Sequence, residues 1–286
     1  MPAPGNLVAP YGVTPVYPVH TNGQLWQYEH NDPAGGSFTW GSSKQIGNGW
    51  QGRVLAGPSG YFYSITTGGE LRLLHFNGSS WDPYASGVYQ VIGQGWNYIA
   101  ATTKYKITVD EDGVIYTLET DGRLRAWYFD VMAKNWTILG ATLATGLGST
   151  YNAIIGAGRG VLYLRTTAGV LHRWYIDDWT TPATPTFQKP TTSMSTGWTN
   201  FKNFSSSGGD VIYVVNASGT LLHYKWNTST SKLTAGTTIG SGWGSEQDVI
   251  VSSNTTTRSN PATAFSSLGP NDGGAALARI NAVKLP

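Results

Sequence analysis

Four tryptophans that directly follow a glycine have the clearest capacity for binding chemistry. They form the pairs Gly49–Trp50, Gly95–Trp96, Gly197–Trp198 and Gly242–Trp243. An indole has a large flat apolar face and an N–H donor, and a neighbouring glycine lets backbone amides come close to a ligand. These groups could bind a sugar, whose C–H face is apolar and whose rim carries hydroxyl groups. The same tryptophans could equally fill the space between packed sheets, and the sequence leaves both interpretations open.

A second group of tryptophans precedes these pairs in the chain. Trp40, Trp81 and Trp136 fall on the strands expected to lie outermost in a repeated unit. We expect them to share the two roles, packing against the next unit and contacting a ligand there. The tryptophans expected in the core lie within predicted strands and are Trp127, Trp174 and Trp226.

No residue pattern predicts catalysis, a metal site or a bound cofactor. The chain has no Cys, which excludes thiolate chemistry and Cys-bound zinc. The five His residues fall at similar places in different repeats, so we do not expect them to converge on a metal. Most acidic residues lie in turn sequences, and no Gly-x-Ser-x-Gly motif occurs. Arg72, Arg125 and Arg173 are expected to be exposed charges on strands.

Composition narrows the range of partners. Charged residues make up 12% of the chain and the net charge is only +2. A nucleic-acid-binding protein needs a strongly basic face, so no nucleic-acid partner is expected. No apolar run is long enough to cross a bilayer, so no membrane insertion is expected. The first residues lack the basic and apolar regions of a secretory signal.

The elements that must position these residues come in five repeats. A Gly-x-Leu element begins at Gly23, Gly69, Gly122, Gly169 and Gly219, with spacings of 46, 53, 47 and 50 residues. A Tyr precedes each of these glycines by six residues. Gly-rich turns separate short apolar segments, which predicts four antiparallel strands in each repeat. Repeats of this size and strand number predict an all-β, five-bladed β-propeller.

The ends of the chain predict a closed ring. The N-terminal part begins within a repeat, and the segment around Val249–Val251 supplies a first strand without a successor. Pairing of the N- and C-terminal strands would complete one blade and remove exposed sheet edges. We therefore expect the propeller over residues 6–253. Residues 254–286 are expected to be a C-terminal tail, with a polar linker and a possible short helix at 275–283, through which the protein could form oligomers.

With this repeat, the chain resembles the tachylectin family of five-bladed propeller lectins. The resemblance rests on Ile-Gly-x-Gly-Trp, an aliphatic-Tyr strand and Gly-x-Leu, and it covers all five repeats. It implies binding of N-acetylated hexosamines such as N-acetylglucosamine, at sites between neighbouring blades, without metal or catalysis. One repeat departs from the pattern, because Gly148–Tyr151 occupies the expected place of its Gly-Trp pair. We expect an altered or lost site there.

These observations predict a multivalent, non-catalytic lectin that binds glycans or glycoconjugates between its blades. In each pocket the Gly-Trp loop of one repeat would face the outer strand of the next, with the Trp stacking on the ligand or donating to it. Two alternatives stay open: a propeller that binds proteins or has a structural role, and a propeller glycoside hydrolase with carboxylates in its central channel. An extracellular or cell-surface location is expected, with cytoplasmic storage as the alternative.

Overall fold

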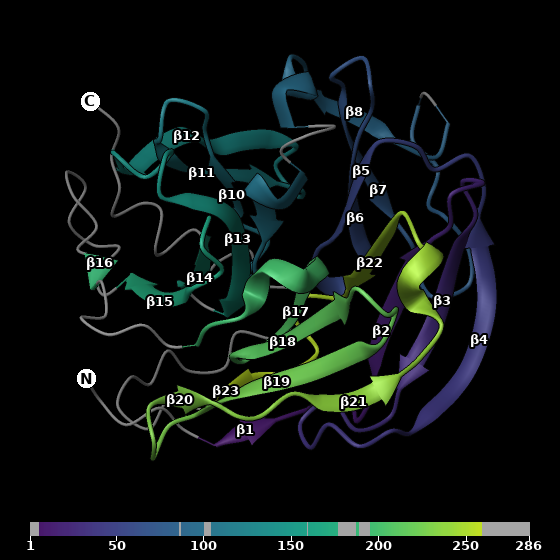
Figure 1. The fold of residues 1–286 in the computed structure, drawn as a ribbon. Coiled ribbons are helices and arrows are strands. Elements are labelled where there is room, and N and C mark those ends of the chain that lie inside the picture. Colours follow the sequence, from purple (N-terminus) through teal and green to yellow (C-terminus); the bar gives the residue numbers. More distant parts are fainter. Residues whose placement is uncertain are drawn as a thin grey trace.

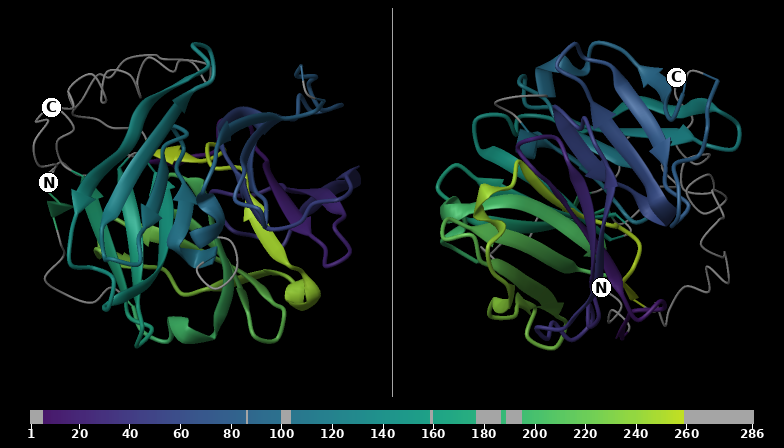
Figure 2. Two further views of the ribbon diagram at one scale, coloured as in Figure 1. Left: turned by 90° about the horizontal axis from the view of Figure 1, so that it is seen from above. Right: turned by 90° about the vertical axis from the view of Figure 1, so that its right-hand side faces the viewer.

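The computed structural model describes residues 6–85, 87–99, 104–158, 160–176, 187–188 and 195–258. These residues form five main antiparallel β-sheets and no α-helix. The sheets lie around a common centre, with the N-terminal strands beside the last strands of the described chain (Figures 1 and 2). The structure is the five-bladed β-propeller that the sequence predicts.

Each blade is one sheet, and its strands follow one another from the centre of the ring outward. Blade 1 consists of β22 (Asp248–Val251), β2 (Thr14–Val19), β3 (Leu25–His30) and β4 (Trp40–Gly47). Blade 2 consists of β5 (Arg53–Ala56), β6 (Tyr61–Ile65), β7 (Leu71–His75) and β8 (Gln90–Gly93). Blade 3 consists of β9 (Ile107–Val109), β10 (Ile115–Leu118), β11 (Leu124–Asp130) and β12 (Asn135–Ala144).

The remaining two blades have less regular outer strands. Blade 4 consists of β13 (Tyr151–Gly158), β14 (Val161–Thr166), β15 (Leu171–Ile176) and β16 (Phe187–Gln188). Blade 5 consists of β17 (Phe201–Gly208), β18 (Val211–Asn216) and β19 (Leu221–Asn227), with β20 (Lys232–Leu233) and β21 (Thr237–Gly240) both paired to β19. Short 3-10 turns connect strands at η1 (Pro58–Gly60), η2 (Trp96–Ile99), η3 (Lys104–Lys106), η4 (Trp198–Asn200) and η5 (Trp243–Ser245).

The repeated tyrosines belong to the second strand of each blade, where neighbouring blades pack. Each is at most 4% exposed, and the five are Tyr17, Tyr63, Tyr116, Tyr163 and Tyr213. Aliphatic residues surround them on the same strands, as in β18, where five consecutive residues are buried. Burial on both faces of a strand favours such continuous apolar runs over alternation. The repeated tyrosines therefore pack neighbouring blades against one another.

The last described blade strand closes the ring. β22 pairs with β2, with Val251 opposite Val16 and Asp248 opposite Val19. The Arg53 guanidinium of blade 2 contacts the Asp248 carboxylate of blade 1 at 2.7 Å, and each side chain is less than 5% exposed. A buried charge is tolerated when it is paired, so this contact joins the first complete blade to the closing strand. The predicted closure by N- and C-terminal strands is confirmed.

The chain continues past β22 across one end of the ring. Its hydroxyl groups bond to three blades: Thr255 to the Thr14 hydroxyl (2.7 Å), Ser253 to the Asp110 carbonyl (2.8 Å) and Thr256 to the Gly208 carbonyl (2.7 Å). β23 (Thr257–Arg258) then pairs with β1 (Leu7–Val8). The stretch 254–258 thus differs from the expected linker, because its polar side chains bond to the blade ends. The helix expected at 275–283 lies outside the described residues.

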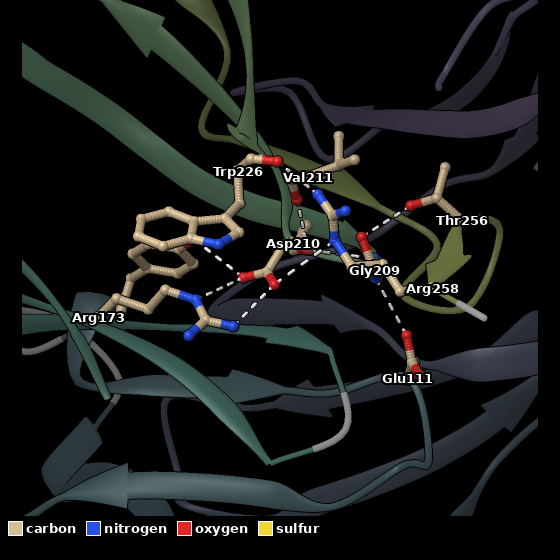
Figure 3. Close-up of polar contacts among 11 residues, drawn as sticks. Glu111, Arg173, Gly209, Asp210, Val211, Trp226, Thr256 and Arg258 are labelled. Carbon is tan, nitrogen blue, oxygen red and sulfur yellow. Dashed lines mark hydrogen bonds and ion pairs between the residues drawn. The ribbon is translucent and has the colours of Figure 1, made fainter. Parts of the chain in front are cut away.

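A buried carboxylate anchors this terminal segment (Figure 3). Asp210 accepts two hydrogen bonds from Arg173, at 3.0 and 2.8 Å, and one from the Tyr163 hydroxyl at 2.9 Å. Arg258 lies 3.6 Å from the same carboxylate and also donates to the Trp226 carbonyl. Arg173, expected to be an exposed strand charge, is instead largely buried, because Asp210 and the Trp226 ring enclose it. The cluster connects blades 4 and 5 to the end of the described chain.

Replacing Asp210 with Asn removes the carboxylate that Arg173 and Arg258 share and takes this counter-charge away from two largely buried guanidinium groups. We expect Asp210→Asn to lower the free energy of unfolding by about 3–5 kcal/mol, measured by urea denaturation. Asp121→Asn is the matched control, because Asp121 pairs with Arg123 at an exposed turn, and its unfolding midpoint should not move. Equal midpoints for the two variants would contradict the anchoring role.

Two buried histidines lie where blade 5 meets blade 1. His30 and His223 are at most 1% exposed, and their ring centroids are 6.0 Å apart. A ring nitrogen of each donates to a carbonyl of the β3–β4 connection, His30 to Ser37 and His223 to Pro33. The other nitrogen of His30 accepts from the Tyr213 hydroxyl, an arrangement that suits a neutral ring. Burial lowers the pKa of both histidines, that of His223 to about 4.

These lowered pKa values predict acid sensitivity at this junction. In the unfolded chain a His has a pKa near 6.5, so below that pH only the unfolded state takes up the proton. The stabilising effect of a neutral His223 is therefore complete above about pH 6.5 and is lost as the pH falls toward about 4.

We expect the protonation of His223 to lower the free energy of unfolding by about 3 kcal/mol between pH 7 and pH 4. Urea denaturation at the two pH values measures this loss. His223→Gln keeps a donor toward Pro33 but does not titrate, so its stability should fall less between the two pH values. An identical pH dependence in wild type and variant would contradict this explanation.

Candidate functional site

The Gly-Trp loops join the outer strand of one blade to the innermost strand of the next, and the same backbone bond holds each one. The amide of the residue after the loop glycine donates to the glycine carbonyl of the Gly-x-Leu turn in the same blade. The pairs are Trp50 to Gly23 (3.0 Å), Trp96 to Gly69 (2.9 Å), Leu147 to Gly122 (2.9 Å), Trp198 to Gly169 (3.0 Å) and Trp243 to Gly219 (2.9 Å). All five loops therefore lie on one face of the ring, beside the turns between second and third strands.

The indoles of these loops point into the space between blades. Trp50, Trp96, Trp198 and Trp243 are only 8%, 5%, 1% and 9% exposed. With so little surface exposed, none of these indoles presents a whole ring face on which a sugar could stack. The geometry therefore favours the interpretation that the indole faces pack between blades. The exposed part of each loop is instead its second glycine and the residue before it.

The first glycine of each Ile-Gly-x-Gly-Trp sequence makes room for the indole. A Cβ atom on Gly47 would lie 2.4 Å from the Trp50 Nε1 atom. Gly93 and Gly240 show the same approach to Trp96 and Trp243, at 2.5 Å in both cases. A side chain of any size at these positions would displace the ring, which explains in steric terms why the sequence has glycine there.

The outer tryptophans of one blade meet the Gly-Trp loop of the preceding blade. Each donates its Nε1 hydrogen to the carbonyl of the Ile that opens the loop sequence: Trp40 to Ile239 (2.5 Å), Trp81 to Ile46 (2.5 Å) and Trp136 to Ile92 (2.7 Å). Their rings lie near those of Trp243, Trp50 and Trp96, with centroid distances of 5.6, 5.2 and 6.2 Å. Trp40 and Trp136 lie in outer strands, whereas Trp81 forms an isolated bridge with Phe76.

The junction between blades 3 and 4 corrects one sequence expectation. Gly146 and Leu147, rather than Gly148–Tyr151, occupy the place of the Gly-Trp pair, because Leu147 makes the shared bond to Gly122. Gly146 has a φ of +76°, close to the values of the other loop glycines. Gly146 follows Gly122 by 24 residues, close to the 26 between Gly23 and Gly49, and this spacing could have located it. The loop is retained, and only its indole is missing.

The accessible part of each loop is its second glycine and the residue before it. Gly49, Gly95, Gly146, Gly197 and Gly242 all have positive φ, and a Cβ on any of them would meet nothing within 4 Å. The preceding residues are all exposed, polar and uncharged: Asn48, Gln94, Thr145, Thr196 and Ser241. The sequence motif leaves this position unspecified, although its polar character in every repeat is visible in the sequence.

Acidic and histidine side chains are engaged elsewhere in the fold. Asp110 accepts bonds from its own turn and from the Tyr116 hydroxyl, and His75 bonds to Asp82. The small space among the inner strands is lined by residues such as Arg53, Thr108 and Ser206, and its described lining residues include no Asp or Glu. Within the described ranges, no three His, Asp or Glu side chains form a group that could hold a metal. In the same ranges, no helix is long and apolar enough to cross a membrane.

Comparison with known families agrees with this repeated geometry. Residues 18–248, more than half of the chain, match the Tachylectin family. The chain belongs to the Tachylectin family. No curated protein matches this family member.

Solved structures of propeller proteins resemble this tachylectin-family chain. One, described as the de novo evolutionary emergence of a symmetrical protein shaped by folding constraints, has a TM-score of 0.52 and 18% identity, covering 83% of this chain and 98% of that one. A variant of the Aleuria aurantia lectin with alpha-methyl-L-fucoside has a TM-score of 0.45 and 13% identity, covering 82% and 77%. AofleA from Arthrobotrys oligospora has a TM-score of 0.42 and 13% identity, covering 82% and 74%. The first of these shows a shared fold.

The burial of the loop indoles predicts a stability role for Trp96. Its ring lies 4.9 Å from the Trp127 ring and is stacked near Trp136. Trp96→Ala would open a cavity between blades 2 and 3, and we expect a loss of about 3–5 kcal/mol in unfolding free energy, measured by urea denaturation. Gln94→Ala, two residues earlier on the exposed loop, is the control and should leave stability nearly unchanged. Unchanged stability of Trp96→Ala would instead indicate a ligand-facing indole.

Proposed function

We propose that this protein is a non-catalytic, multivalent lectin that binds neutral glycans at its inter-blade loops. The observation that carries the proposal is the fivefold repetition of an exposed Gly loop with one geometry, at every junction between blades. Open space at each loop glycine leaves the backbone accessible, and each loop adds an uncharged polar side chain. Such groups match the hydroxyl and acetamido groups of an N-acetylhexosamine, the sugar class that the family resemblance favours.

In the proposed pockets, buried side chains would position the loop and accessible groups would bind the sugar. At the three junctions that have both, the buried indole and the outer tryptophan of the next blade hold the loop in position through ring contacts and the Nε1-to-carbonyl bond. The loop amides and residues such as Gln94 would then make the hydrogen bonds to the sugar. A single shallow site of this kind binds weakly, and several on one ring raise the avidity for a surface that bears many glycans.

Two alternatives are less well supported. A protein partner would occupy one patch and would not require the same exposed loop at every junction. A glycoside hydrolase needs two suitably spaced carboxylates, whereas the described carboxylates at Asp110, Asp210 and Asp248 are taken up by hydrogen bonds or ion pairs. The glycan surfaces that a multivalent lectin would meet lie outside cells, and we propose an extracellular or cell-surface site of action.

A glycan array with free N-acetylglucosamine as competitor tests this proposal. We expect competed signals that persist after addition of a chelator, because no metal takes part in the proposed contacts. Replacing all five exposed loop residues, Asn48, Gln94, Thr145, Thr196 and Ser241, by Ala should lower the array signal at least tenfold, since weak contacts at several sites combine.

The matched control replaces Ser43 and Thr142, which are exposed on outer strands, and should bind like wild type. Folded wild-type protein without any competed signal would overturn the proposed function. Full binding by the five-residue variant would assign recognition to groups other than these side chains.

A further inference from the structure

A separate pocket lies on the opposite face of the ring from the Gly-Trp loops. Its volume is about 200 Å³, and it lies where blades 1 and 2 meet the segment that follows β22. The turn between β5 and β6 forms one wall, with Ser59 and Gly60, and the segment before β2 forms another. The Gly-Trp loops lead into the N-terminal ends of the innermost strands β5 and β22, whereas the pocket lies at the C-terminal ends of these strands. The two kinds of site are therefore distinct.

Two largely buried residues in the pocket wall have hydroxyl groups without a partner among the described residues. Tyr17 is 4% exposed and Ser252 is 5% exposed, and both side chains line the pocket. No residue of the described ranges hydrogen-bonds to either hydroxyl. Neither hydroxyl oxygen is among the fully buried side-chain atoms that lack a hydrogen bond, so both are accessible from the pocket and can bond to a molecule that enters it.

The tyrosines equivalent to Tyr17 differ from blade to blade in what their hydroxyls bond to, and the hydroxyl of Tyr63 in blade 2, like that of Tyr17, has no hydrogen bond within the described residues. The equivalent tyrosine hydroxyls of three blades are satisfied by the protein: Tyr116 by Asp110, Tyr163 by Asp210 and Tyr213 by His30. At the corresponding place beside Tyr17 the chain provides the open pocket instead. The site is therefore no copy of the fivefold loops, and residues after β22 help to build it.

The lining restricts what the pocket can hold. The described residues that line it carry no charged side chain, which disfavours ions. Val13, Pro15 and the ring of Tyr11, which is 53% exposed, provide an apolar and aromatic wall. Asn254 has an amide whose two bonds to Ser59 leave one N–H and one acceptor position free. The volume lies below the roughly 300–1,000 Å³ of sites for drug-sized ligands, so one small ring is the expected size.

We propose that this pocket binds a single neutral pyranose ring. The apolar C–H face of the sugar would lie against Tyr11 and Pro15. Its hydroxyls would bond to Tyr17, Ser252 and the free amide positions of Asn254. The site does not depend on glycan binding at the Gly-Trp loops and would remain if those loops bind nothing.

Fluorine NMR of the full chain labelled with fluorotyrosine tests the proposal. The variants Tyr11→Phe and Tyr17→Phe assign the two signals by their disappearance. Methyl glucoside and N-acetylglucosamine are the probes, titrated across the millimolar range. We expect saturable shifts of the Tyr11 and Tyr17 signals, and an affinity about threefold to tenfold weaker in Tyr17→Phe, read from the Tyr11 signal, because one hydrogen bond is lost.

Two controls make the result decisive. Tyr63→Phe changes the equivalent residue of blade 2, away from the pocket, and should keep wild-type affinity. Cyclohexanol has a ring of similar size with one hydroxyl and should bind more weakly than the sugars. The proposal is overturned if neither sugar moves the two signals, if cyclohexanol alone moves them, or if Tyr63→Phe weakens binding as much as Tyr17→Phe. A missing array signal would leave these shifts in place, so the two proposals fail independently.

Discussion

One backbone hydrogen bond occurs in all five blades and fixes the relation between each blade and the next. It joins the glycine carbonyl of the Gly-x-Leu turn to the amide that follows the loop glycine, at 2.9–3.0 Å. It persists where Leu147 replaces tryptophan, so the backbone and not the indole is the constant element. Because the loop glycine has positive φ, the chain can turn at this point from the outer strand of one blade into the centre of the next.

The two faces of the ring follow from this constraint in different ways. On the loop face the same small structure is repeated at each junction, which suits repeated weak contacts with a polymeric or clustered ligand. On the opposite face the segment after β22 breaks the symmetry by bonding to several blades and ending at the Asp210 cluster. The pocket beside Tyr17 lies where this segment passes.

Much of the fold could be predicted from the sequence, because the repeat spacing counts the blades and the incomplete first repeat indicates how the ring closes. The role of the tryptophans could not, since a Gly-Trp loop has the same sequence whether its indole faces solvent or the next blade. Packing against Trp81 or Trp136 comes from residues more than 30 positions away. The hydrogen bonds of residues 254–258 cannot be predicted for a similar reason: short polar side chains are typical of a linker, and their partners lie in distant blades.

The claim that loops recognise glycans while indoles hold blades together is tested most directly by a crystal structure with N-acetylglucosamine. We predict sugar at the exposed loop glycines, including the one beside Leu147, with hydrogen bonds to loop amides and to residues such as Gln94. The indoles should stay buried between the blades. A sugar lying flat on the ring face of Trp96, or bound only in the central channel, would contradict this explanation.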